Sequence, residues 1–204
     1  MKLTILGGTG RTGRHLITLA LAAGHQVTAL ARNPGALPDD PHITAVEGSP
    51  LDPNAIAQVV AGADAVLSAL GGVGQAHTTL YSESVRNILA ADPARLIVVG
   101  AVPASPNDEK TIFERYLLHP LLHRFFGGDY DDIRRMEELL SDSPSAWTVL
   151  RPPRLTDGPA TGRYRSGTGR LPRPGQISRT DLAAAMLEVI ADPGTHHQFI
   201  TVSY

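Results

Sequence analysis

The first 24 residues combine a mainly apolar, strand-like run with a pattern of helical spacing. Residues 1–6 form the strand-like run, and Gly24 supplies a helix stop. Between them, apolar residues recur every three or four positions, at Leu16, Leu19, Ala20 and Ala23. This change of period predicts a strand, a turn and then a helix.

Strand-like and helical patterns alternate along the rest of the chain. The strand-like segments are Gln26–Ala31, Ile43–Glu47, 64–70, 95–100, Trp147–Arg151 and 197–202. The helical segments between them are 53–61, 78–91, 130–141 and 179–191. This alternation predicts an α/β fold, a Rossmann-type doubly wound parallel sheet, in a single domain that spans 1–204 with a short helical insert.

Ligands of such a sheet bind beyond the carboxyl ends of its strands. The loops that follow the first, second, fourth, fifth and sixth strands are therefore expected to converge on one cleft. These loops begin after Leu6, Ala31, Leu70, Gly100 and Arg151.

The predicted first turn reads Gly7-Gly8-Thr9-Gly10-Arg11-Thr12-Gly13. Glycines at 7, 10 and 13 permit a tight turn, close approach of the backbone to a pyrophosphate, and close packing of the helix on the strand. The N–H groups at the amino terminus of the helix are available to the phosphates. Because strand and helix patterns flank the turn, it indicates a dinucleotide-binding site more than an ordinary glycine-rich turn.

The second predicted strand ends just before Arg32, where a Rossmann unit places the residue that faces the adenosine ribose. Asp or Glu there would accept hydrogen bonds from a free 2′-hydroxyl, whereas a guanidinium binds phosphate oxygens. The sequence therefore favours NADP over NAD. Arg11 is a candidate for a second positive charge near the same phosphate, and a solvated surface position is the alternative for either arginine.

The composition indicates one soluble domain. The chain has 204 residues, 42% of them hydrophobic and 5% aromatic, a formal net charge of −2 and no cysteine. No stretch approaches the roughly 18 apolar residues of a membrane span, and too few residues precede the glycine turn for a signal peptide. Disulfides and thiolate metal sites are excluded. We expect a cytoplasmic protein that binds neither membranes nor nucleic acid.

The segment after the fifth strand-like run, residues 102–129, breaks the alternation of strands and helices. It opens with turn-forming residues and continues with apolar residues up to Gly127-Gly128. This pattern is typical of a short helical lid hinged at the glycine pair, and a statically packed helical excursion is the alternative. His119 and His123 share a helical face, but a proline lies between them and no acid completes a zinc-protease pattern, so we expect no metal site.

The loop expected after the sixth strand, residues 151–176, is rich in arginine, glycine and proline. Six arginines and one acidic residue, Asp157, lie between positions 151 and 173, which gives a local net charge of +5. At the carboxyl end of the sheet, this charge favours an anionic small-molecule substrate. A solvated surface loop is the alternative.

With these segments, the chain resembles the atypical short-chain dehydrogenase/reductase group, which includes NAD(P)H-binding flavin and biliverdin reductases and NmrA-like proteins. The resemblance covers nearly the whole length. It is carried by the glycine turn, Arg32, Leu70-Gly71, and Arg151-Pro152-Pro153-Arg154-Leu155-Thr156-Asp157-Gly158 followed by Thr161-Gly162. The last of these looks most like the flavin and biliverdin reductase branch.

The resemblance implies a set of cofactor-binding residues. The phosphates would be held by Thr9, Gly10, Arg11, Thr12 and Arg32. Leu70 and Gly71 would pass along the cofactor, and Pro153 with Arg154 would line its nicotinamide end.

The chain departs from the group's pattern in two places. The group commonly has Gly-Asp after the third strand, where the carboxylate faces adenine, but this chain has Gly48-Ser49, with Asp52 three residues further on. Ser49 is therefore the candidate adenine contact. Reductases of the group often carry a serine near the end of the fifth strand, where this chain has Gly100-Ala101.

The Tyr-x-x-x-Lys pair of ordinary short-chain dehydrogenases is absent, and only Tyr130 has a basic residue, Arg134, four positions later. The two would lie on one face of a helix, where the fixed charge of Arg134 would stabilise a tyrosinate. They are the candidate catalytic residues. The alternative is a tyrosine near the start of the helix beside a surface arginine.

These residues favour an NADPH-dependent oxidoreductase that transfers a hydride to a flavin or a similar conjugated acceptor. Reduction of an unactivated ketone needs a proton delivered to the developing alkoxide, whereas flavin reduction needs stacking, orientation and a proton from water. A non-catalytic NADP sensor of the NmrA type is the alternative. A sugar-nucleotide epimerase would need the Tyr-Lys pair and usually a larger carboxyl-terminal domain.

Overall fold

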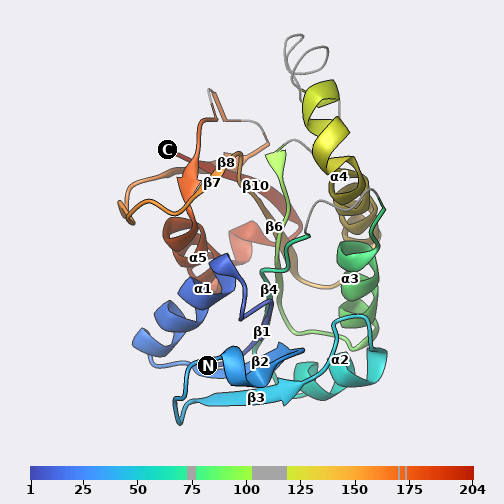
Figure 1. Cartoon of the computed structure of the whole chain (residues 1–204), viewed down its shortest axis with the longest axis vertical. Coiled ribbons are helices and arrows are strands. Elements are labelled where there is room, and N and C mark those ends of the chain that lie inside the picture. Colours follow the sequence, from blue (N-terminus) through green and yellow to red (C-terminus); the bar gives the residue numbers. More distant parts are fainter. Residues whose placement is uncertain (73–76, 103–118, 170, 173) are drawn as a thin grey trace.

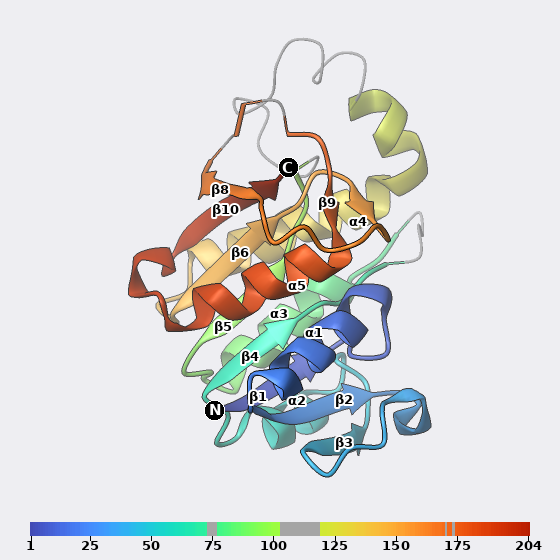
Figure 2. The same cartoon turned by 90° about the vertical axis from the view of Figure 1, so that its left-hand side faces the viewer.

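The computed structural model describes residues 1–72, 77–102, 119–169, 171–172 and 174–204. Its centre is an eight-stranded sheet with the order β3-β2-β1-β4-β5-β6-β10-β8, which Figure 2 shows from β3 at one edge to β8 at the other. Neighbouring strands are parallel except β8, which runs antiparallel to β10. The eight strands are β1 (Lys2–Leu6), β2 (Gln26–Ala31), β3 (Ile43–Glu47), β4 (Ala65–Ser68), β5 (Leu96–Val99), β6 (Trp147–Arg151), β8 (Arg165–Thr168) and β10 (Gln198–Ser203).

Helices cover both faces of the sheet. Figure 1 shows α1 and α5 on one side of it and α2, α3 and α4 on the other. Their bounds are α1 (Arg11–Ala22), α2 (Pro53–Val60), α3 (Leu80–Ala90), α4 (His119–Ser141) and α5 (Arg179–Glu188). Short 3₁₀ turns lie at Pro34–Ala36, Val189–Ala191 and Pro193–Thr195.

The strand residues alternate between two hydrophobic cores. In β1, Leu3 and Ile5 pack against the α1 and α5 side, while Leu6 packs against the side of α2, α3 and α4. In β4, Leu67 packs on the α1 and α5 side, and Val66 packs on the side of α2, α3 and α4. A strand buried on both faces favours apolar residues on both, and β1 and β4 are apolar except at Lys2, Thr4 and Ser68.

The predicted α/β fold with a parallel, doubly wound sheet is confirmed. The chain winds outward through β1, β2 and β3, returns to the centre, and winds the other way through β4, β5 and β6. The direction therefore reverses between β1 and β4. Ligands of such folds bind at this reversal, beyond the carboxyl ends of the strands.

The boundary predicted between a lid and the 130–141 helix is wrong. Within the described residues, α4 is continuous from His119 to Ser141, so Gly127 and Gly128 lie inside the helix and do not separate two elements. Each glycine costs a helix only about 1 kcal/mol relative to alanine, a cost that packing against α3 outweighs. The first part of the predicted insert, 103–118, lies outside the described residues.

The arginine-rich segment is also more regular than the sequence indicates. It contains β8 and the short strand β7 (Leu155–Thr156), which pairs in parallel with β9 (Ile177–Ser178) just after the segment. β7 and β9 have two residues each and β8 is polar, so none of the three carries a recognisable hydrophobic alternation. Their pairing with distant segments defines them, and a local pattern does not reveal it.

A buried ion pair ties α4 to the end of β6. The Arg151 guanidinium donates from Nε to Oε1 of Glu137 at 2.9 Å and from Nη2 to Oε2 at 2.8 Å. The two side chains are only 3% and 7% exposed, and the guanidinium also lies over the Phe199 ring at 4.1 Å. A Cβ added at Gly100 would lie 3.0 Å from Glu137 Oε1, so a glycine at the end of β5 leaves room for this pair.

We predict that Glu137→Gln lowers the free energy of unfolding by about 3–5 kcal/mol, because it leaves the Arg151 charge buried without its carboxylate. Glu83→Gln is the matched control: it breaks the Arg86–Glu83 pair, whose side chains are 55% and 41% exposed. That change is expected to cost at most about 1 kcal/mol. Urea denaturation measures both, and equal losses would contradict the assigned role of the buried pair.

Candidate cofactor-binding site

The glycine turn between β1 and α1 is held by close backbone contacts. Gly7 has φ +78°, and the Gly10 N–H donates to its carbonyl oxygen at 2.9 Å. A Cβ added at Gly13 would lie 2.0 Å from that same oxygen, and one added at Gly7 would lie 2.7 Å from the Ala69 oxygen. Side chains at 7 and 13 are therefore sterically excluded, as the sequence motif requires.

The amino terminus of α1 presents backbone donors at this turn. Its N-cap, Gly10, makes no side-chain capping bond, and the first helical turn contains no acidic residue. Arg14 braces the turn by donating from Nε to the Thr9 carbonyl oxygen at 3.1 Å. A helix start with open N–H groups and no nearby carboxylate on its first turn favours an anion.

The segment after β4 lies beside the glycine turn and forms one wall of the candidate cofactor site. The Ala69 N–H donates to the Leu6 carbonyl oxygen at 3.0 Å, so residues 69–72 continue from β4 beside the glycine turn. Leu70 is half-buried there and Gly71 is exposed. The predicted cofactor residues at 7–13 and at 70–71 thus lie at the reversal between β1 and β4.

Arg32 and Ser49 lie at the carboxyl ends of β2 and β3. Arg32 is exposed, and no hydrogen bond or ion pair of its side chain occurs among the described residues. Ser49 follows Gly48, whose N–H donates to the Ala31 carbonyl oxygen at 3.1 Å, and the Ser49 hydroxyl accepts from the Leu51 N–H at 3.2 Å. Asp52 caps α2 by accepting from the Asn54 N–H at 2.9 Å, so its carboxylate is engaged locally.

Three attachments fix the segment after β6, which holds Pro153 and Arg154. The Pro152 carbonyl oxygen accepts from the Val102 N–H at 3.1 Å, and that of Arg154 accepts from the Ile177 N–H at 2.9 Å. Asp157 then accepts from Arg179 Nη1 at 2.7 Å and from Arg11 Nη2.

Asp157 therefore bridges the starts of α1 and α5 at the glycine turn. Arg11, expected from the sequence to supply charge near a ribose phosphate, pairs with this carboxylate.

Asp181 anchors the next part of the same segment. It accepts from the Thr161 N–H at 2.8 Å, the Gly162 N–H at 3.0 Å and the Tyr204 hydroxyl at 2.6 Å. Burial opposes ionisation, but these hydrogen bonds outweigh it and lower the pKa of Asp181. The Thr161-Gly162 pair noted in the sequence is thus the contact that holds this segment to α5.

The described arginines of the 151–176 segment lie in different environments. Arg151 is buried against Glu137, and Arg165 donates to the carbonyl oxygens of Pro172 and Tyr204, both at 2.7 Å. Arg154 and Arg163 are exposed. Glu137 therefore neutralises one of the charges behind the expected local +5, that of Arg151, while Arg170 and Arg173 lie outside the described residues.

The two candidate catalytic residues share helix α4. Tyr130 is half-buried, and burial, followed by the nearby Asp129 carboxylate, raises the pKa of its phenol. Arg134 donates from Nη1 to Asp131 Oδ1 at 3.0 Å on the same helix. The phenol is therefore a protonated donor and not a group poised to ionise, and a catalytic role for the pair stays a prediction.

Two residues near the candidate cofactor site were missed by sequence reasoning. Asp157 was counted only as the lone acid among arginines, although its opposite charge was a usable signal. The other is Tyr81 on α3, whose hydroxyl accepts from the Gly72 N–H at 2.5 Å in the segment after β4. No local pattern marks Tyr81, because its partner is set by tertiary packing.

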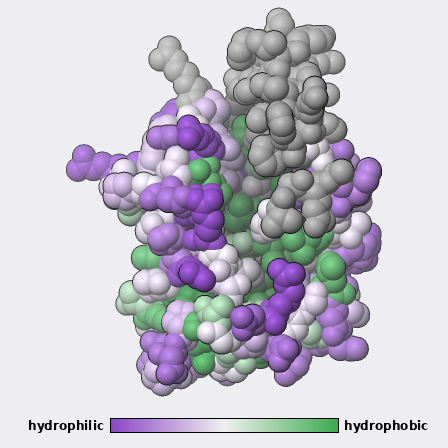
Figure 3. Space-filling model, viewed as in Figure 1, coloured by the Kyte–Doolittle hydropathy of each residue, from purple (hydrophilic) through white to green (hydrophobic). Residues whose placement is uncertain are grey.

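The surface of the described residues is unevenly apolar. In the space-filling view, hydrophobic side chains gather in the middle of one face, bordered by hydrophilic surface (Figure 3). Small-molecule sites are commonly lined by apolar side chains with a few polar groups.

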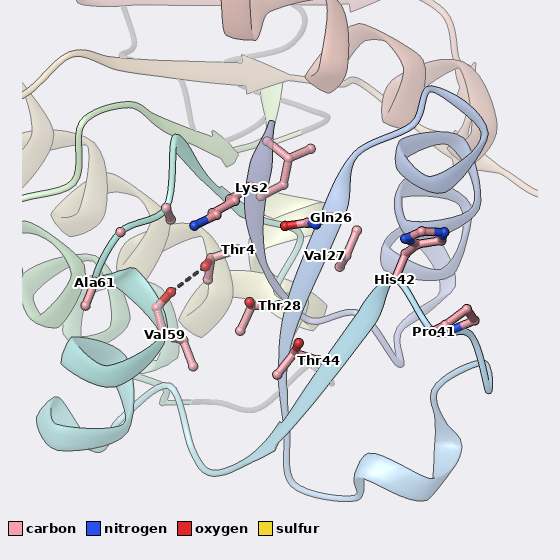
Figure 4. Close-up of a pocket in the computed structure, with 13 residues that line it drawn as sticks. Lys2, Thr4, Gln26, Val27, Thr28, Pro41, His42, Thr44, Val59 and Ala61 are labelled. Atoms are coloured by element: carbon pink, nitrogen blue, oxygen red, sulfur yellow. Dashed lines mark hydrogen bonds between the residues drawn. The ribbon is translucent and has the colours of Figure 1, made fainter.

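A separate hollow lies at the opposite end of the sheet, near the amino ends of β1, β2 and β3 (Figure 4). Its volume is about 360 Å³, and its lining includes Lys2, Gln26, Thr28, His42 and Thr44. Because ligands of doubly wound sheets bind at the carboxyl ends of the strands, we assign the cofactor to the glycine turn and not to this hollow.

The chain belongs to the NAD(P)H-binding family, whose model matches residues 7–193. The match begins at the first glycine of the turn and includes every predicted cofactor residue. The fold and the site geometry thus define a nicotinamide dinucleotide-binding protein.

Similar proteins occur in several bacteria. The chain is 26% identical over 213 residues to the uncharacterized protein YwnB of Bacillus subtilis, an alignment that covers 99% of this chain and 98% of the relative. A short-chain dehydrogenase/reductase of Veillonella parvula, solved in complex with NADP, has a TM-score of 0.82 at 21% identity over 100% of this chain and 94% of the other. ChuY, an anaerobillin reductase from Escherichia coli O157:H7, has a TM-score of 0.82 at 22% identity over 100% and 97%. Within the described residues, no helix is long and apolar enough to cross a membrane.

We predict that Gly13→Ala weakens dinucleotide binding at least about tenfold and lowers the free energy of unfolding by about 1–3 kcal/mol, because its Cβ displaces the glycine turn. Gly175→Ala is the control, since a Cβ there meets nothing within 4 Å. Cofactor titration and urea denaturation measure the two effects. Unchanged affinity in Gly13→Ala would show that the dinucleotide binds elsewhere.

Proposed function

We propose that this protein is an NADPH-dependent oxidoreductase that delivers a hydride to a flavin or a similar conjugated acceptor. The observation that carries the cofactor assignment is Arg32, exposed at the carboxyl end of β2 where a ribose-facing acid would select NAD. Arg32 is a guanidinium without a described partner, so it is available to a 2′-phosphate.

The cofactor and the chain divide the chemistry. NADPH supplies the hydride when bound. The chain's own residues hold its phosphates at the α1 start, keep side chains out of the turn through Gly7 and Gly13, and place Pro153 and Arg154 on the opposite wall. The ion pairs of Asp157 with Arg11 and Arg179 hold that wall beside the glycine turn.

The environment of the candidate proton donor supports a conjugated acceptor. The group described as the candidate acid, Tyr130, has a raised pKa, and the neighbouring Arg134 is ion-paired with Asp131. Such a pair is poorly suited to stabilising a tyrosinate, as reduction of an unactivated ketone would require. A conjugated acceptor that takes its proton from water fits better, and the reductase named ChuY shares the fold.

A cofactor sensor without turnover is the competing function. It would bind NADPH equally well, and the weak proton-donor set suits it too. The discriminating experiment is a steady-state screen of NADPH oxidation against riboflavin, FMN, quinones and linear tetrapyrroles. Turnover with one of these acceptors supports the oxidoreductase, whereas tight NADPH binding with no oxidation of any of them supports the sensor.

We predict that the wild type binds NADPH more tightly than NADH and that Arg32→Ala removes most of the difference. Loss of a charge-assisted contact costs about 1.5–3 kcal/mol, or about 10- to 150-fold in affinity. Titration of both cofactors measures it, with Arg86→Ala on α3 as the control for a loss of surface charge. Equal affinities of the wild type for NADPH and NADH would contradict the NADP assignment.

We predict that Tyr130→Phe keeps most of the flavin reductase turnover, because the reduced flavin takes its proton from solvent. The measurement is kcat with NADPH and a flavin, together with cofactor affinity. A fall in kcat beyond about 100-fold at unchanged affinity would instead make Tyr130 the general acid.

A further inference from the structure

The segment after β4 faces the glycine turn across the reversal of the sheet. An added Cβ on Gly7 would lie 2.7 Å from the Ala69 oxygen, so the two backbones are in contact at that point. From Ala69 the segment runs through Leu70 and Gly71 to Gly72, and both of these glycines are exposed. Leu70 packs against the core, but the two glycines have no side chain to pack, so the position of Gly71 and Gly72 depends on what holds their backbone.

Gly72 is held by Tyr81, which lies on α3. Its N–H donates to the Tyr81 hydroxyl at 2.5 Å. The Tyr81 side chain is buried, at 8% exposure for the residue, so its ring is fixed by packing between α3 and its neighbours. Gly72 also lies against the Asp129 carboxylate, because a Cβ added at Gly72 would come 2.0 Å from Asp129 Oδ1.

Tyr81 is itself anchored to α4 through its backbone. Its N–H donates to Asp132 Oδ2 at 2.8 Å, and the N–H and hydroxyl of Ser82 donate to the same carboxylate. Asp132 is completely buried, and it caps the first turn of α3 from the neighbouring helix. Tyr81 therefore connects α4 and the start of α3 with the segment after β4.

The protonation state of Tyr81 is constant over the working pH range. Burial raises the pKa of its phenol to about 12, against the opposing effect of the Gly72 hydrogen bond. The hydroxyl is thus neutral at physiological pH, and its contact with Gly72 does not depend on pH there.

We propose that Tyr81 is a positioning residue for the dinucleotide: its hydroxyl holds the Gly72 N–H and thereby fixes the 70–72 wall opposite the glycine turn. This inference rests on the proposed cofactor function. Tyr81 does not touch the reacting atoms. It acts through the backbone of Gly71 and Gly72, which would otherwise sample several conformations and lose contact with the cofactor.

The test is Tyr81→Phe, which removes the hydroxyl and keeps the buried ring. A single hydrogen bond is worth about 0.5–1.5 kcal/mol, so the dissociation constant and KM for NADPH should rise about 2- to 13-fold with little change in kcat. Binding is followed by nicotinamide fluorescence, which needs no acceptor. Amide hydrogen exchange at Gly72 should also become faster in the variant.

Tyr164→Phe is the matched control. It also removes a tyrosine hydroxyl, one that donates to Glu188 Oε2 at 2.5 Å on the α5 side of the sheet. A purely structural role for Tyr81 would lower Tm without changing NADPH affinity. Equal NADPH affinity in wild type and Tyr81→Phe, or equal losses in the two variants, would overturn the proposal while leaving the cofactor function intact. A wild type that does not bind NADPH would overturn both.

Discussion

The approach of α1 to the turn that precedes it is the constraint on which the rest of the structure depends. A Cβ at Gly13 would lie 2.0 Å from the Gly7 carbonyl oxygen, so the helix start is pressed against the end of β1. This contact directs the first N–H groups of α1 beyond the carboxyl edge of the sheet. The same turn also meets Ala69 after β4, so one backbone crossing sets both the anion-binding helix start and the adjoining wall.

The wall after β6 is held by ion pairs and by hydrogen bonds to a carboxylate. Arg151 and Glu137 fix the end of β6 to α4, Asp157 joins the starts of α1 and α5, and Asp181 holds Thr161 and Gly162. A glycine- and proline-rich segment has high conformational entropy when it is not attached. These carboxylates hold it in one position, and two of them, Glu137 and Asp157, pair with Arg151 and Arg11, which the sequence alone presents as free positive charges.

Local sequence patterns were sufficient for the fold and the cofactor turn because both depend on neighbouring residues. The bounds of β2, β3 and β6 agree with the predicted segments, since each is a short run with a clear period or a continuous apolar core. The glycine turn is read from spacing, and its steric reason is visible at Gly7 and Gly13. The continuation of α4 through Gly127 and Gly128 was not predictable locally, because packing against α3 outweighs their low helix propensity.

Partnerships between distant residues were equally hidden. Arg151 and Glu137 are 14 positions apart on a strand and a helix, and Tyr81 meets Asp132 across 51 positions, so no local periodicity marks either pair. For the same reason, the local net charge of +5 read from the sequence includes the charge of Arg151, which the structure pairs with Glu137.

The most direct test of the central claim is a crystal structure of the chain with saturating NADP. The expected result is a pyrophosphate on the backbone N–H groups at the start of α1, with the 2′-phosphate beside Arg32 and the nicotinamide toward Pro153. A dinucleotide bound away from the glycine turn, for example in the hollow lined by Lys2 and His42, would contradict the assignment, as would no bound dinucleotide at saturating concentration.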